Sequence, residues 1–143
     1  MKLLSDNLEL FLRLAALAQL GVALLNLFLI RIMKWERDLS SAPLLIREVF
    51  QIHTYFISGT LAIFGTLTWR FAGDIARAAH PLCVWLAIGI GCFWSVRSVM
   101  QWSHYSVSHW RSDRLRTLIH WTLFLGYGAL GAVYFIAAGV SDK

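Results

Sequence analysis

Four long stretches of this sequence carry no formal charge, and charged residues bound each of them. They run over residues 14–30, 49–69, 78–96 and 117–141. A bilayer core requires about 20 apolar residues in a row, and a segment of that length satisfies its own backbone hydrogen bonds in lipid only as a helix. The stretches therefore predict an all-α integral membrane protein with four transmembrane helices. We expect the spans to cover residues 10–33, 49–69, 79–102 and 117–140.

The composition indicates a chain that has lipid as its solvent. Hydrophobic residues make up 58% of the sequence and charged residues 15%, whereas soluble proteins contain about 25% charged residues. A chain of 143 residues has too little interior to bury so much apolar surface. These values exclude a disordered chain, a secreted disulfide scaffold and a typical soluble enzyme. The net charge of +5 lies in short segments between the apolar stretches, which favours lipid headgroups over nucleic acid as partners.

The connections between the expected spans are short, which predicts a single domain over residues 1–143 and an antiparallel up-down bundle. We expect turns at residues 40–43 and at Gly73-Asp74. Eight of the 13 Lys and Arg residues then lie on the side of the first and third connections. Because cytoplasmic loops are enriched in basic residues, loops 34–47 and 103–116 are predicted to be cytoplasmic and both termini non-cytoplasmic.

Small and polar residues recur along one face of the first expected span. They are Ala16, Gln19, Ala23 and Asn26, at spacings of three and four residues. Small residues let membrane helices approach closely, and buried amides form hydrogen bonds across them. Glycines recur in the other three spans. We interpret both features as helix packing, with room for a flat cofactor as the alternative.

Polar residues collect at one end of the predicted bundle. The second span begins there, the third ends there and the fourth begins there, so the antiparallel topology places their polar residues at one membrane face. These residues are Arg47, Glu48, Gln51 and His53 of the second span, Trp94, Arg97, Gln101, His104 and Tyr105 of the third, and His120 of the fourth. Together they form the candidate ligand site or structural polar network.

Arg97 is the formal charge that lies deepest in this layer. Trp94, Gln101 and Tyr105 share its helix face, because they follow spacings of three and four residues. An arginine at this depth either extends to the interface or faces the bundle interior. In the second case we expect it to contact Glu48, Gln101 or a bound anionic group, because an unpaired buried charge is strongly unfavourable.

His53 and His120 lie at a similar depth at the starts of two different spans. Two histidines on facing helices are what a bis-imidazole haem b requires, and a nearby arginine such as Arg97 suits a propionate. His104 is a further candidate at the same face. The other interpretation is that these are ordinary interfacial residues. The sequence holds no spacing typical of a metal site, so no metal ion is expected.

Three functions remain open from the sequence. The first is an accessory or anchor subunit of a larger membrane complex, in contact with lipids and with other subunits or further copies of itself. The second is a redox anchor that holds haem b or a quinone near His53, His104 and His120; this placement is similar, in topology alone, to small haem-bearing membrane anchors of respiratory enzymes. The third is a lipid- or isoprenoid-handling enzyme or binding protein, with an acid–base pair drawn from Glu48, His53, His104 and Tyr105.

Overall fold

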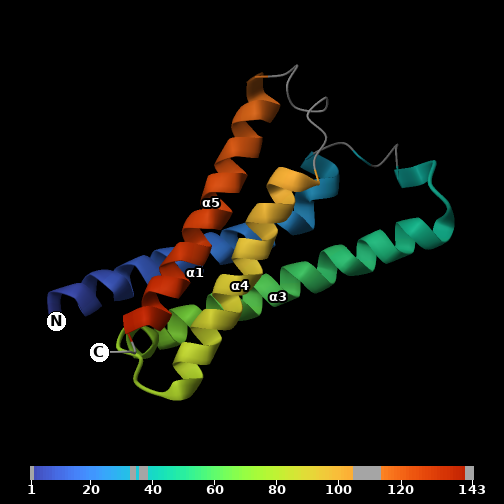
Figure 1. Cartoon of the computed structure of the whole chain (residues 1–143). Helices are drawn as coiled ribbons and strands as arrows, with labels where there is room; N and C mark the ends of the chain where they lie inside the picture. Colours follow the sequence, from blue (N-terminus) through green and yellow to red (C-terminus); the bar gives the residue numbers. More distant parts are fainter. Residues whose placement is uncertain (1, 33–34, 36–38, 105–113, 141–143) are drawn as a thin grey trace. The chain divides into compact units, whose positions relative to one another are not determined.

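The structure is a computed structural model that describes residues 2–32, 35, 39–104 and 114–140. The regular elements in these ranges are α-helices, and no strand is found among them. The long helices are α1 (Lys2–Ile32), α3 (Leu44–Ala76), α4 (Pro81–Ser103) and α5 (Arg114–Gly139) (Figure 1). The all-α prediction is therefore confirmed for the described residues.

Three of the helices are long and apolar enough to cross a bilayer, as expected of an integral membrane protein. The qualifying segments are Ser5–Phe28, Pro81–Ser103 and Thr117–Gly139. Helix α3 contains the second predicted span but is not among the three. Its stretch 49–69 is uncharged, yet Gln51, His53 and several Ser and Thr residues reduce its mean hydropathy. The span over residues 49–69 therefore stays a prediction.

The connection after α3 differs from the one predicted. Gly73 and Asp74 lie inside the helix, where the amide of Arg77 donates to the carbonyl of Gly73 at 3.2 Å. The helix is kinked at Phe71, whose φ is −112° and ψ is 19°. The turn itself comes later, where Ala78 adopts a φ of 46°. Helix α4 then begins at Pro81, in the first turn as expected, because proline needs no amide partner there.

The chain divides into two compact units. The α1–α3 unit comprises Arg13–Arg70, and the α4–α5 unit comprises Met1–Leu12 together with Phe71–Lys143. In the α1–α3 unit, the amide of Asn26 donates to the carbonyl oxygen of Thr54 at 3.2 Å and to the hydroxyl oxygen of Ser58 at 2.9 Å. These bonds join α1 to α3, as the predicted stripe on the first helix requires.

Gly65 marks a close approach within the α1–α3 unit. A Cβ atom added there would lie 3.0 Å from the carbonyl oxygen of Ala16 and 2.8 Å from Cγ of Leu20. Ala16, Gln19 and Ala23 are buried on the same side of α1. The small-residue face thus serves helix packing in this unit.

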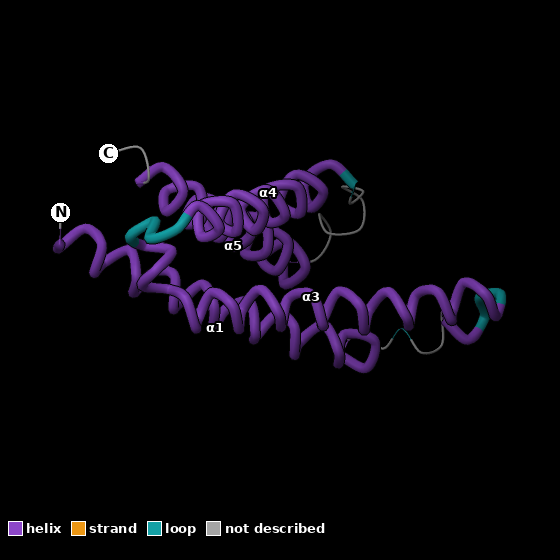
Figure 2. Tube along the Cα trace, turned by 90° about the horizontal axis from the view of Figure 1, so that it is seen from below, coloured by secondary structure: helices purple, strands orange, loops and turns teal. Residues whose placement is uncertain are grey.

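Helices α4 and α5 pack side by side (Figure 2). The buried residues of α4 include Ala87, Gly91, Trp94, Ser98 and Gln101, which alternate between spacings of four and three. On α5, the buried aromatic residues His120, Tyr127 and Tyr134 recur every seven residues. These are the spacings of a left-handed coiled-coil seam, in which each helix presents one narrow stripe to its neighbour.

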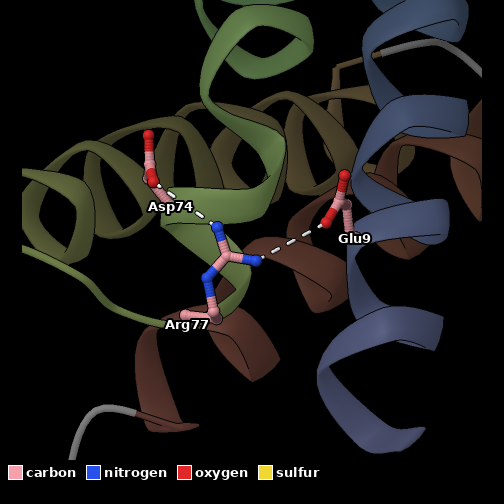
Figure 3. A network of polar contacts seen from close by, with 3 residues as sticks. All are labelled: Glu9, Asp74 and Arg77. Carbon is pink, nitrogen blue, oxygen red and sulfur yellow. Dashed lines mark ion pairs between the residues drawn. The ribbon is translucent and has the colours of Figure 1, made fainter. Parts of the chain in front are cut away.

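The same unit joins the first turns of α1 to the end of α3. The guanidinium of Arg77 lies 3.8 Å from a carboxylate oxygen of Glu9 and 3.6 Å from one of Asp74 (Figure 3). The Arg77 side chain is 57% exposed, and exposed ion pairs of this kind contribute only about 0–1 kcal/mol. The burial of Leu12 and Ile75 contributes more than this ion pair to the stability of this part of the unit.

Candidate functional site

A chain of hydrogen bonds links three of the polar residues predicted to share one membrane face. Arg97 donates from Nη1 to Oε1 of Gln101 at 3.2 Å, one helical turn further along α4. The amide nitrogen of Gln101 lies 3.3 Å from Nδ1 of His120 on α5. Gln101 is 4% exposed and His120 5% exposed. The chain therefore runs from a partly exposed cation to the buried seam between the two helices.

Aromatic rings support the charged end of this chain. The guanidinium carbon of Arg97 lies 5.0 Å from the centroid of the Tyr127 ring. The Tyr127 ring in turn stacks on that of Trp94, with centroids 5.2 Å apart and an interplanar angle of 25°. An aromatic face attracts a cation electrostatically, and the attraction strengthens when water is excluded. Of the partners expected for Arg97, Gln101 is in place, and Tyr127 is an additional partner.

The chemistry of the chain fixes its direction. A guanidinium can only donate, so the atom of Gln101 that faces Arg97 is the carbonyl oxygen. The amide nitrogen of Gln101 is then the atom that faces His120, and it donates to Nδ1. Nδ1 must accept, so the neutral imidazole of His120 carries its proton on Nε2. The orientation of the Gln101 amide, the donor role of its nitrogen and the tautomer of His120 thus all follow from Arg97.

The close fit of α4 on α5 positions these side chains. The hydroxyl of Ser98 donates to the carbonyl oxygen of Phe124 at 3.0 Å and so ties the two backbones together. A Cβ added at Gly131 would lie 2.6 Å from Oγ of Ser95. Only a residue without a side chain leaves room for this separation without a movement of Ser95. The seam is narrow enough for a neutral amide to reach from one helix to an imidazole on the other.

The residues predicted for the second span lie in the other unit. Arg47 and Gln51, one turn apart on α3, line one pocket of about 210 Å³. Glu48 and His53 are exposed. His53 lies in the α1–α3 unit and His120 in the α4–α5 unit, so the two predicted haem ligands do not meet within one compact unit. Of the candidate acid–base residues, Glu48 and His53 share the α1–α3 unit, whereas His104 lies in the α4–α5 unit.

The remaining predicted residues lie at the end of α4. His104 is its C-terminal cap, exposed, with Nδ1 at 3.0 Å from the hydroxyl of Ser103. His104 therefore does not join the buried chain. Tyr105 lies outside the residues that the structure describes.

Sequence reasoning missed Tyr127 and Ser98. The signal for Tyr127 was available, because it follows His120 by seven residues and therefore shares its face of a helix in a coiled-coil seam. Ser98 likewise follows Gly91 by seven residues, with Trp94 and Gln101 at the complementary positions. Polarity alone does not single out these two residues, whereas the seven-residue repeat does.

The arrangement disfavours His120 as a haem ligand. Axial ligation uses a ring nitrogen with a free electron pair, and the tautomer of a metal-bound histidine is set by the bond of its other nitrogen. Here Nδ1 accepts a hydrogen bond and Nε2 carries the proton. Ligation through Nε2 would require a proton on Nδ1, which would then point at the donating amide of Gln101.

Within the described parts of the chain, no group of three or more His, Cys, Asp or Glu side chains is placed to hold a metal ion. No known protein family, no curated protein and no solved structure matches this chain. The geometry of its own residues is therefore the basis for proposing a function.

Proposed function

We propose that this chain is a non-enzymatic anchor or accessory subunit of a larger membrane assembly, formed with other membrane proteins or with further copies of itself. The hydrogen-bond chain from Arg97 through Gln101 to His120 carries the proposal. These residues direct polar atoms at one another across α4 and α5. Their polar groups hold two spans together and are therefore not directed at a substrate.

The outward faces of the spans support assembly. In the most apolar part of the three candidate spans, only 33%, 28% and 22% of the residues are buried. Gly89 on α4 and Gly126 on α5 have open space where a Cβ would lie. Small residues on a membrane helix allow a second helix to approach closely. These faces therefore suit a partner helix.

We further propose that α3 supplies a fourth span, over residues 49–69, and that the four spans form an antiparallel up-down bundle. The length of α3, 33 residues, and its uncharged stretch support this topology. The distribution of Lys and Arg favours cytoplasmic loops at 34–47 and 103–116 and non-cytoplasmic termini.

Labelling with a membrane-impermeant maleimide tests the topology, in a background in which Cys83 and Cys92 are replaced by serine. We expect Ser141→Cys to react in intact cells and Ser40→Cys to react only after permeabilisation. Equal reaction of both variants in intact cells would place both positions on the same side and contradict the four-span arrangement. Reaction of Ser40→Cys alone in intact cells would contradict the orientation.

The assembly is tested by extracting the protein with its surrounding lipid into polymer-bounded discs and measuring the particle mass. We expect a protein mass above that of one 16.3 kDa chain, with a stoichiometric partner or a second copy. Gly126→Ile should reduce the larger species, because its branched side chain fills the open face. Leu125→Ile, at the exposed neighbouring position, is the matched control. A single chain as the sole species would contradict the proposal.

A further inference from the structure

The pocket at the start of α3 combines one charge with an apolar wall. Its lining consists of Ile30, Leu39, Ser40, Arg47, Phe50 and Gln51, and its volume is about 210 Å³. Among the described residues that line it, Arg47 is the one with a formal charge. Glu48 follows it in the sequence but is not part of the lining. An anion that enters the pocket therefore meets a cation and no carboxylate among these side chains.

Two side chains that can donate hydrogen bonds line the pocket. The Arg47 guanidinium and the Gln51 amide form no hydrogen bond or ion pair with the residues that the structure describes. They are four residues apart on α3, so they project from the same helix face. A guanidinium fork beside an amide suits the oxygen atoms of a phosphate, because arginine binds phosphate through two parallel N–H bonds.

The other wall of the pocket is apolar. Ile30 comes from the end of α1, two residues beyond the candidate span Ser5–Phe28, and Phe50 is the second residue of the uncharged stretch of α3. The ring of Trp35 packs edge-on against Phe50, with centroids 6.4 Å apart. Free inorganic phosphate has no hydrocarbon group that could contact this apolar wall. A ligand with a phosphate at one end and hydrocarbon at the other matches both walls.

The position along the chain agrees with such a ligand. The pocket lies where α1 leaves its candidate span and α3 begins, and the ends of membrane spans are where proteins meet lipid phosphates. We propose that this pocket binds the glycerophosphate part of an anionic phospholipid. Arg47 and Gln51 hold the phosphate oxygens, and Ile30 and Phe50 contact the start of the acyl chains. This inference is independent of the proposed role as an anchor subunit.

Native mass spectrometry of the full-length protein in detergent tests the site by titration with phosphatidylglycerol. Arg47→Gln should weaken binding of the first lipid by about tenfold or more, since a hydrogen bond to a charged group is worth about 1.5–3 kcal/mol. Arg47→Lys should recover only part of the affinity, because lysine lacks the planar fork. Arg114→Gln, which removes an exposed arginine of α5, is the matched control and should leave the affinity unchanged.

Other outcomes would overturn the inference. Equal weakening by Arg47→Gln and Arg114→Gln would mean general attraction to a basic protein rather than a site. Equal affinity for phosphatidylcholine would remove the requirement for a net negative ligand. Displacement of the lipid by equimolar inorganic phosphate would assign the pocket to free phosphate. Thermal unfolding of the lipid-free variants should match that of the native protein, which separates loss of binding from loss of fold.

Discussion

Gln101 on α4 donates a hydrogen bond to Nδ1 of His120 on α5, over 3.3 Å inside the seam between the helices. The direction of this bond is set at a third residue, because Arg97 occupies the carbonyl oxygen of the same amide. A side chain near the edge of the unit thereby determines the tautomer of a buried imidazole. In a low-dielectric seam each bond of such a chain polarises the next.

The tautomer of His120 is directly measurable. We expect the ¹⁵N resonances of His120 to show a protonated Nε2 and an unprotonated Nδ1 in the native protein. In Gln101→Glu the carboxylate can only accept, so His120 must turn a proton toward it, and the Nδ1 resonance should shift to the protonated range. His104, which is exposed, is the internal control and should not change. A protonated Nδ1 in the native protein would contradict the direction of the chain.

Haem binding through His120 is expected to be absent. With Nδ1 accepting from Gln101, the nitrogen that would bind iron carries a proton. Protein purified from cells supplied with ample haem should therefore show no Soret band that depends on this residue. A Soret band that disappears in His120→Ala, but persists in His104→Ala, would refute both this expectation and the tautomer.

Arg97→Leu should destabilise the protein by about 1–3 kcal/mol, because it leaves the buried oxygen of Gln101 without its donor and removes the cation from the face of Tyr127. The cost is that of an unsatisfied neutral acceptor, since the partner found is an amide and not a carboxylate. Arg97→Lys should recover part of the loss. Thermal unfolding in one detergent measures both variants. A leucine variant as stable as the native protein would instead place Arg97 among residues that only extend to the interface.

Gly65→Ala should destabilise the α1–α3 unit by about 1–3 kcal/mol, the usual cost of an extra methyl group in a tight contact. The added Cβ meets the backbone carbonyl of Ala16 at 3.0 Å, and a backbone atom in a helix cannot rotate away. Gly59→Ala, on the same helix, is the matched control, since nothing lies within 4 Å of its Cβ position. It should be neutral or stabilising by up to about 1 kcal/mol. Equal unfolding temperatures for the two variants would show that α1 and α3 do not approach at Gly65.

The partners of the polar residues could be foreseen only in part. The spacing of Trp94, Arg97 and Gln101 was sufficient to place them on one helix face, because 3.6 residues per turn is a property of the single helix. The bond from Gln101 to His120 joins residues 19 positions apart on two helices, and no local spacing encodes it. By charge alone Glu48 was the better partner for Arg97, because the amide of Gln101 is neutral.

The sequence by itself determined that this chain is helical and belongs in a membrane. Run length, hydropathy and the position of Pro81 are local properties, and they act on each segment separately. Only the tertiary structure decided which face of each helix meets a neighbour. It distinguished Gly65 and Gly131, which allow close approach, from Gly59 and Gly126, which do not. It also placed the turn between α3 and α4 after Gly73-Asp74, whereas the sequence predicted the turn at these two residues. The physical reason is that a helix fixes which residues share a face, whereas the choice among faces depends on the shape and the polar groups of the helix opposite.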